Sequence, residues 1–155
     1  MSEPEKSSDF TVASRVAGPP LIGALLRIPW ETVRRRMLER LHEHGHADLD
    51  APHLTVFQYP GPQDARPSEL AARLGVSKQS LNYLLGELER LGYLERRPDP
   101  QDLRSRRIAL TRRGEQAIEV IRDAVAEIER EWEATLGAKR FAQLQRLLRE
   151  VAGSS

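Results

Sequence analysis

The segment Arg66–Gly114 constrains the fold more than any other part of this 155-residue chain. It begins with two stretches that have apolar residues at helical spacing, joined by the short turn Gly75-Val76-Ser77. Two β-type runs follow, separated by a basic loop rich in Pro, Asp and Arg. This order predicts a helix-turn-helix followed by a β-hairpin, with a helix and a charged loop side by side.

Capping and helix-breaking residues define the two helices of this segment. Pro67 and Ser68 open the first helix, which Gly75 ends, and Ser77 is a suitable N-cap for the second. The second helix is expected to end at Gly92. Its buried face is predicted to consist of five leucines: Leu81, Leu84, Leu85, Leu88 and Leu91.

The hairpin is predicted between the second helix and Thr111. Strands are expected at Tyr93–Arg97 and Arg106–Leu110, with the loop Pro98–Ser105 between them. Thr111 is a suitable N-cap for a long C-terminal helix. The expected fold class is therefore mainly α with a small antiparallel β-wing, a winged helix-turn-helix flanked by N- and C-terminal helices.

The region before the helix-turn-helix is predicted to be helical with one interruption. Residues 20–44 have apolar residues at helical spacing, and Pro29 either kinks this region or ends a short first helix. Ala51–Gln58 is interpreted as a short connecting helix, and the prolines and glycine of Tyr59–Pro67 predict a loop. Residues 1–18 are polar and small, and are expected to form a flexible tail.

The C-terminal helices have the apolar spacing of packed helix pairs. Apolar residues recur at intervals of mostly three or four residues in 112–136 and 138–152, at Ile118, Ile121, Val125, Ile128, Trp132, Phe141, Leu144, Leu148 and Val151. Because a small winged unit cannot cover so many amphipathic helices, we expect a homodimer. Residues 19–58 and 114–155 would supply the dimerisation helices, and 59–113 the winged unit. A single-chain helical cap is the alternative.

Charge is concentrated in the winged unit. Residues 66–113 carry 11 Lys/Arg and 6 Asp/Glu, a net charge of +5, whereas the rest of the chain carries a net charge of −4. This asymmetry favours a polyanionic partner, double-stranded DNA. The chain has no Cys, which excludes disulfides and thiolate metal sites. It shows no signal peptide or membrane-spanning run, so we expect a cytoplasmic protein without membrane contact.

The exposed face of the second helix is predicted to contact base edges. A helical wheel places six residues on or beside this face: Lys78, Gln79, Asn82, Tyr83, Gly86 and Arg90. Gln79 and Asn82 can each make paired hydrogen bonds to a base edge, and Ser77 and Ser80 suit phosphates. Gly86 indicates close approach of another surface, because glycine inside a helix is otherwise unfavourable. A merely solvated polar face is the alternative.

The hairpin is predicted to supply arginines to the same partner. Arg104 and Arg106 are placed near its tip, where an arginine can enter a narrow minor groove. Asp102 is expected to orient the guanidinium of Arg104 through a charge-assisted hydrogen bond, or else to be a solvated surface acid. The arginines placed on the strands, which suit phosphates or brace the wing, are Arg96, Arg97 and Arg107.

The sequence ELAARLGVSKQSLNYLLGELERLGYLERRPDPQDLRSRRIALTRRG resembles the DNA-binding core of the multiple antibiotic resistance regulator (MarR) family. The family pattern joins an ELA helix, a leucine-rich helix ending in LE.LGY, a DP.D.RS wing and an LT..G helix start. The resemblance covers about a third of the chain strongly.

The resemblance implies a triangular homodimer that represses or activates at a pseudopalindromic site and is released by a small phenolic or anionic effector. It also implies that Gln79, Ser80, Asn82 and Tyr83 lie on the base-reading part of the helix. Asp102 and Arg104 would form the wing-tip pair. Two departures are the lead-in loop YPGPQDARP and the lack of a Cys for oxidation sensing.

An effector pocket is hypothesised near Trp30, Arg34, Phe57 and Tyr59. These aromatic and cationic side chains would suit an aromatic carboxylate. The alternative is that Trp30 and Phe57 belong to the core, because the grouping of these four residues in space is an assumption.

The segment His42–His46 contains the H-E-x-x-H pattern of zinc peptidases. Gly45 lies at the expected helix end, and the pattern needs a continuous helix, so we expect neither an enzyme nor a cofactor. A zinc-responsive regulator using His42, His44 and His46, with Asp48 or His53, is a lesser alternative to a solvated helix end. A further alternative is a winged-helix module that binds a protein.

Overall fold

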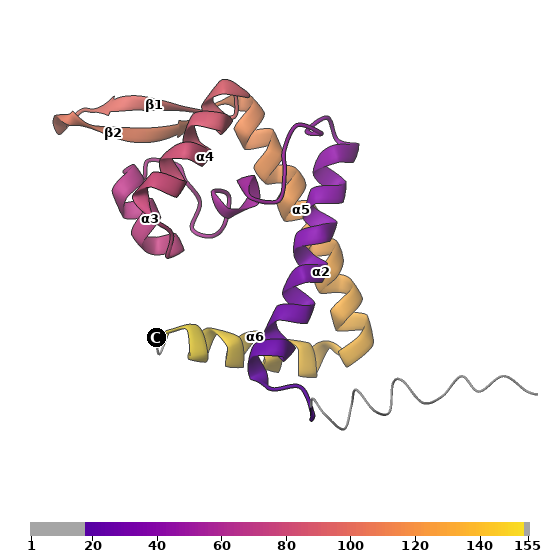
Figure 1. The fold of residues 1–155 in the computed structure, drawn as a ribbon. Coiled ribbons are helices and arrows are strands. Elements are labelled where there is room, and N and C mark those ends of the chain that lie inside the picture. The colour runs from indigo at the N-terminus through magenta and orange to yellow at the C-terminus, as the bar shows by residue number, and fades with distance from the viewer. Residues whose placement is uncertain (1–17, 154–155) are drawn as a thin grey trace, which may run out of the picture. The chain divides into compact units, whose positions relative to one another are not determined.

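The computed structural model describes residues 18–153, so the tail predicted over residues 1–18 lies almost entirely outside the described residues. The chain forms two compact units, Met1–Val33 and Arg34–Ser155. In chain order (Figure 1) the elements are α2 (Ile22–Glu43), η1 (His53–Thr55), α3 (Pro67–Leu74), α4 (Lys78–Arg90), β1 (Leu94–Asp99), β2 (Asp102–Leu110), α5 (Arg112–Leu136) and α6 (Ala138–Gly153). The expected fold class is confirmed, since five α-helices accompany one two-stranded antiparallel sheet within residues 18–153.

Helix α2 runs through Pro29 without ending there. Of the two alternatives for Pro29, a kink or the end of a short first helix, the second is therefore excluded. A proline inside a helix removes one backbone hydrogen bond but leaves the bonds of neighbouring turns. Next to it, the hydroxyl of Thr32 donates to the carbonyl oxygen of Ile28, and Arg27 forms an ion pair with Glu31 at 2.8 Å.

The segment between α2 and α3 contains less helix than the sequence suggested. Only the 3₁₀ turn η1 forms within the predicted helix 51–58. The backbone here instead makes successive short turn bonds, such as Val56 N–H to the carbonyl of His53. The side chains of His53, Leu54, Val56 and Phe57 are buried. The loop predicted at Tyr59–Pro67 is confirmed up to Arg66 and contains a cis Tyr59–Pro60 bond.

The helix-turn-helix follows the predicted signals. Gly75 ends α3 in the left-handed region with φ of 65°. The Ser77 side chain then accepts a hydrogen bond from Ser80 N–H and begins α4. Of the five leucines predicted for the core face, Leu81, Leu85 and Leu88 are fully buried, and Leu84 and Leu91 are half-buried.

The hairpin is longer than predicted. Strands β1 and β2 pair from Leu94↔Leu110 to Pro98↔Arg106, and an irregularity follows before Asp99. Only Pro100 and Gln101 lie between the strands, so the predicted loop Pro98–Ser105 is wrong. A projecting hairpin is solvated on much of both faces. The outer parts of its two strands therefore lack the alternation of apolar and polar residues by which strands are recognised in a sequence.

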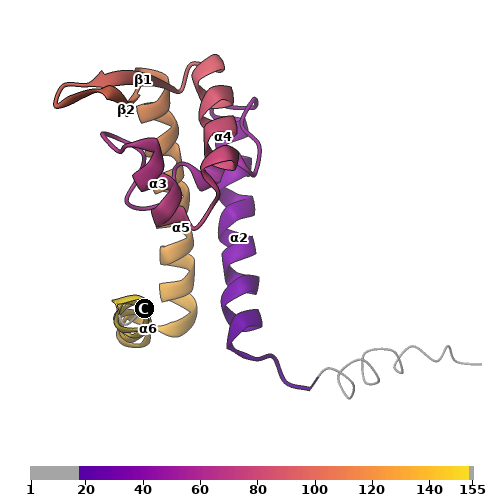
Figure 2. The same cartoon turned by 60° about the vertical axis from the view of Figure 1, so that its left-hand side comes forward.

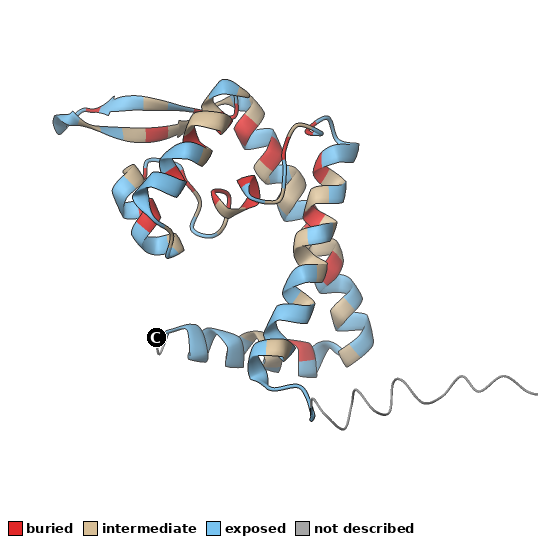
Figure 3. Cartoon of the chain, in the orientation of Figure 1, coloured by how far each residue is buried: buried red, intermediate tan, exposed pale blue. Residues whose placement is uncertain are grey.

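Helix α5 begins at the base of the hairpin and leads through Gly137 into α6. Figures 1 and 2 show α4 and the hairpin together at the first part of α5, with α6 at its other end. Ile128 and Phe141 of the predicted apolar seam are buried, whereas Leu148 and Val151 are exposed. In Figure 3 exposed residues dominate the last turns of α6.

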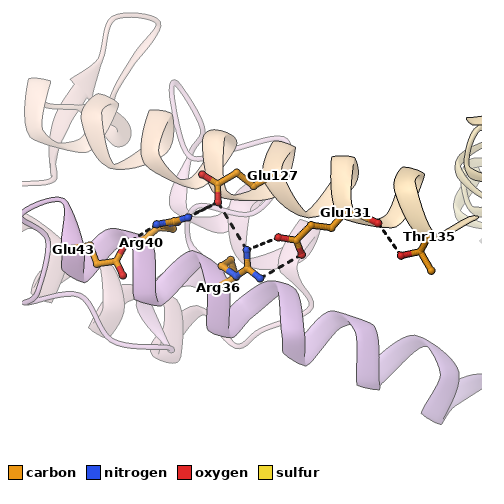
Figure 4. A network of polar contacts seen from close by, with 6 residues as sticks. All are labelled: Arg36, Arg40, Glu43, Glu127, Glu131 and Thr135. Carbon is orange, nitrogen blue, oxygen red and sulfur yellow. Dashed lines mark hydrogen bonds and ion pairs between the residues drawn. The ribbon is translucent and has the colours of Figure 1, made fainter. Parts of the chain in front are cut away.

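Ion pairs join the last turns of α2 to α5 (Figure 4). Arg40 Nη2 lies 2.7 Å from Glu127 Oε2, and Arg36 Nη1 lies 3.0 Å from Glu131 Oε1. Arg40 also contacts Glu43 at 2.9 Å. Within residues 18–153, no helix is both long enough and apolar enough to cross a lipid bilayer.

Candidate nucleic-acid interface

One face of α4 presents polar side chains to solvent. Lys78, Gln79, Asn82, Tyr83 and Arg90 are all exposed, as the helical wheel predicted. Gln and Asn side chains have the donor and acceptor pair that matches the edge of adenine. The face therefore has the chemistry to read bases.

The N-terminus of α4 has one serine engaged in capping and one available. Ser77 Oγ accepts from Ser80 N–H at 3.0 Å, and its own hydroxyl donates to Ser80 Oγ at 2.8 Å. The Ser80 hydroxyl proton remains available to a phosphate oxygen. Ser77 thus acts first as the cap, and a phosphate would meet Ser80 more readily.

Gly86 does not mark a tight contact inside the protein. A Cβ at this position would meet only Arg96 Nη2, at 4.0 Å. An alanine would therefore fit in the isolated chain, and any close approach at Gly86 must come from another molecule.

Arg104 and Arg106 extend from the outer part of β2. Both are exposed, and neither guanidinium belongs to an ion pair within residues 18–153. Asp102 Oδ1 accepts from the backbone N–H of Arg104 at 3.1 Å. The prediction that Asp102 orients the Arg104 guanidinium is therefore wrong, because the carboxylate stabilises the backbone turn instead.

Asp99 is the residue that sequence reasoning missed. Its side chain is 0% exposed, and its carboxylate accepts from Gln101 N–H at 3.0 Å and from Arg66 Nε at 2.9 Å. Arg107 Nε lies 3.1 Å away. The Gln101 N–H and the two guanidinium groups hold the pKa of Asp99 far below its usual range, against the effect of burial. The signal was present in Asp99-Pro100, a pair typical of side-chain-stabilised turns.

Two arginines of the strands, Arg96 and Arg107, brace the wing. Arg96 Nη2 lies 2.8 Å from Glu89 Oε2 of α4, and Glu89 also accepts from the Arg96 N–H, which lowers the pKa of Glu89. Arg107 donates to the carbonyl oxygen of Asp64 at 2.8 Å in addition to its contact with Asp99. Arg97 pairs with Glu95 on the same strand. Between the two predicted roles, the contacts of Arg96 and Arg107 favour bracing.

Comparison with known proteins agrees with this geometry. Residues 59–105, which include α3, α4 and most of the hairpin, match the model of the MarR family. The transcriptional regulator Tm0710 from Thermotoga maritima is 30% identical and aligns over 84% of this chain and 90% of its own, with a TM-score of 0.54. The chain belongs to the MarR family of winged-helix transcription regulators.

Solved structures of other regulators share the fold. The reduced form of MarR from E. coli is 26% identical, with a TM-score of 0.69, and aligns over 86% of this chain and 97% of its own. A MepR variant from S. aureus, solved bound to an oligodeoxyribonucleotide, is 22% identical with a TM-score of 0.55 and aligns over 88% and 99% of the two chains. No curated protein matches the chain.

In this MarR-family chain the three histidines of the His42–His46 segment make separate contacts. His42 Nε2 is 2.7 Å from the carbonyl oxygen of Leu49, and His44 Nδ1 is 2.8 Å from that of Arg40. Helix α2 ends at Glu43, so the H-E-x-x-H pattern does not lie on one helix. Across residues 18–153, no three His, Asp or Glu side chains are grouped as metal ligands. The geometry therefore offers no support for the zinc hypothesis.

His46 belongs to a buried network around Tyr93. The Tyr93 hydroxyl donates to Asp48 Oδ1 at 2.6 Å, so it can accept from His46 Nδ1–H at 3.0 Å. Arg113 lies 4.3 Å above the Tyr93 ring and pairs with Asp48 at 3.0 Å. Burial raises the pKa of Tyr93 and lowers that of His46. This network joins the segment after α2 to the starts of β1 and α5.

Two of the four residues suggested for an effector pocket line one recess. Phe57 and Tyr59 contribute to a recess of about 310 Å³ whose walls also include Ile118, Ile121 and Arg122 of α5. Arg34 is not among its lining residues, and Trp30 belongs to the Met1–Val33 unit. The cationic side chain that lines this recess is Arg122, not Arg34, because the fold places α5 beside the Tyr59 loop.

Proposed function

We propose that this protein is a homodimeric regulator that binds a pseudopalindromic duplex DNA site. Helix α4 would enter the major groove, and the hairpin would place Arg104 or Arg106 in the adjacent minor groove. The observation that carries the proposal is the exposed Gln79, Asn82 and Tyr83 row on α4, next to a braced hairpin with two unpaired arginines. Its structural relative MepR was solved with an oligodeoxyribonucleotide, which supports a nucleic-acid partner.

The proposed site residues divide by chemistry. Gln79, Asn82 and Tyr83 would contact base edges, and Arg104 or Arg106 the minor groove. Phosphate contacts would come from Ser77, Lys78, Ser80 and Arg90. Arg107 would brace the wing through Asp99, and Asp102 would support the wing tip. Since phosphate contacts release counterions, binding should weaken steeply with salt.

Exposed apolar side chains support the homodimer. Leu21, just before α2, is 79% exposed, and Ile22, the first residue of α2, is 70% exposed. On α6, Val151 is 68% exposed, and Leu148 is exposed as well. Apolar groups of this size repeated along a helix are usually covered by another surface. The segments 19–58 and 114–155 of two protomers would therefore form the dimer interface. The winged unit 59–113 of each protomer would bind one half-site.

Release by a small anionic effector is proposed through the recess beside Tyr59. An aromatic carboxylate could place its ring against Ile118 and Phe57 and its charge near Arg122. Helix α5 follows directly from the hairpin, so a ligand there could alter the position of the wing. A panel of phenolic acids added to the DNA complex tests this. The proposal is supported if an acid dissociates the wild-type protein from DNA but does not dissociate Arg122→Gln. It is contradicted if none of the acids affects the wild-type complex.

Selection of bound sequences from a random duplex pool tests DNA recognition directly. A two-fold symmetric consensus is expected, and fluorescence anisotropy on that site should give salt-sensitive affinity. Sedimentation of the free protein should show a dimer. Weak binding that is equal for all sequences at low salt would contradict the proposal and favour a winged helix that docks a protein.

A further inference from the structure

His53 lies buried beneath the recognition helix and has a fixed direction for its proton. The side chain is 4% exposed, and Nδ1 accepts from the backbone N–H of Asp50 at 2.9 Å. Because Nδ1 accepts, the neutral imidazole carries its hydrogen on Nε2. Nε2 lies 3.0 Å from Glu87 Oε2, so it donates to that carboxylate of α4.

Glu87 connects this histidine to the exposed face of α4. Its second oxygen, Oε1, accepts from the Tyr83 hydroxyl at 3.2 Å, one helical turn earlier. Tyr83 is 66% exposed, so its ring is available to a partner. Three hydrogen bonds thus run from the Asp50 backbone through His53 and Glu87 to a side chain on the exposed face.

An exposed tyrosine without such a contact would populate several rotamers and lose that freedom on binding. A free glutamate on this helix would also extend toward the phosphates and repel them. The His53 hydrogen bond directs the Glu87 carboxylate and is the main reason that the pKa of Glu87 is lowered. The carboxylate therefore stays ionised and remains a strong acceptor for Tyr83.

We propose that His53 is a positioning residue for DNA recognition, which holds Tyr83 through Glu87 and thereby sets part of the base preference of α4. His53 itself is too buried to reach a base. The inference rests on the proposed function, because it assumes that α4 reads DNA. It adds that the 3₁₀ turn η1, outside the helix-turn-helix, determines how one recognition side chain is presented.

Four variants separate positioning from a general structural role. His53→Gln keeps a donor toward Glu87, whereas His53→Leu has a similar volume and no donor. Tyr83→Phe removes only the hydroxyl, and His53→Leu with Tyr83→Phe completes a double-mutant cycle. Thermal unfolding checks that each variant folds. Glu87→Ala, at a partly exposed position, interrupts the same chain of bonds if His53→Leu does not fold.

Anisotropy with the selected site and its single-base-pair variants measures discrimination. His53→Leu should reduce discrimination at the base pair read by Tyr83 by about three- to ten-fold, the effect of one hydrogen bond. His53→Gln should retain most of this discrimination. In the Tyr83→Phe background, His53→Leu should cause no further loss of discrimination.

Two results would overturn the inference. The first is that both His53→Leu and Glu87→Ala discriminate between base pairs as well as the wild type does. The second is that His53→Leu reduces discrimination equally in the presence and in the absence of the Tyr83 hydroxyl. If the wild type itself binds all sequences equally, the proposed function fails and this inference with it. If the wild type binds specifically and the His53 and Glu87 variants discriminate between sites as the wild type does, only the positioning role is contradicted and the proposed function stands.

Discussion

The carboxylate Oδ2 of Asp99, the last residue of β1, lies 2.8 Å from Nη2 of Arg66. Arg66 is the N-cap residue of α3, so this ion pair joins the hairpin to the helix-turn-helix. The neighbouring backbone reinforces the junction, since Asp64 N–H donates to the Ile108 carbonyl and Ile108 N–H to that of Ala65. The wing is thus held near its turn by Asp99 and along β2 by Ile108, while the side chain of Arg104 is exposed.

We predict that Asp99→Asn loosens the wing. The amide cannot satisfy Arg66 and Arg107 as the carboxylate does, and leaves two guanidinium groups without their shared anion. The thermal midpoint should fall by several degrees, and DNA affinity should fall with it. Asp102→Asn, at an exposed position with one backbone contact, is the matched control and should change the midpoint much less. Equal midpoints for the two variants would contradict the role of Asp99.

The same contact predicts acid sensitivity. The pKa of Asp99 is lowered in the folded state, so the unfolded chain binds its proton first as pH falls. The stabilisation is complete above the unfolded pKa of about 3.9 and is lost as pH decreases below it. Urea unfolding from about pH 5 to pH 3 should show a steeper loss of unfolding free energy in the wild type than in Asp99→Asn. Parallel curves would exclude this contribution.

His46 should make stability depend on pH in a higher window. Burial, then the nearby Arg113, lower the pKa of His46, so the unfolded chain takes up this proton more readily than the folded protein. The contribution is complete above the unfolded pKa of about 6.5 and is lost as pH falls below it. His46→Gln should reduce the slope of unfolding free energy against pH between about pH 7 and pH 5. A slope in His46→Gln equal to that of the wild type would contradict this contribution.

Two glycines should respond oppositely to alanine. A Cβ at Gly114 would collide with the backbone carbonyl oxygen of Tyr93, which already accepts from Thr111 N–H. Gly114→Ala should therefore lower the unfolding free energy by about 2 kcal/mol or more. Gly86→Ala has room and should raise it by up to about 1 kcal/mol, because alanine favours the helix. Chemical denaturation measures both, and a stable Gly114→Ala would show that the strand and helix can separate.

Gly86→Ala also tests how closely a duplex approaches α4. If DNA contacts the helix backbone there, the variant should bind the selected site more weakly although it unfolds at higher denaturant. Unchanged affinity would show that Gly86 faces solvent in the complex.

The helix-turn-helix could be predicted because its signals are local. The Ser77 cap, the left-handed Gly75 and the leucine spacing of α4 each act within a few residues. The hairpin length could not be predicted, because exposed arginine-rich strands have no buried face to impose alternation. Whether Pro29 ends a helix could not be decided from sequence, because a proline is a local signal and the surrounding helix tolerates it.

The supporting contacts could not be predicted from sequence, because their partners are distant along the chain. Asp99 meets Arg66, His53 meets Glu87, and Arg122 reaches the Tyr59 recess only after folding. The exposure of Gln79 and Arg104 could be predicted from the helical wheel and the wing pattern, which need no tertiary information. Exposed positions were therefore easier to predict than the contacts that support these elements.

Substitutions of Gln79 and Arg104 should have different effects on DNA binding. Gln79→Ala removes a paired hydrogen bond to one base and should relax preference at that position by about 1–3 kcal/mol. Arg104→Ala removes a charge from the wing, so it should weaken binding chiefly at sites with a narrow minor groove. It should also lower the slope of log affinity against log salt by about one. Lys139→Ala, an exposed cation on α6, controls for the loss of charge alone. Because the two effects have different physical origins, loss of base preference in Arg104→Ala with an unchanged salt slope would contradict the assignment of helix and wing to separate grooves.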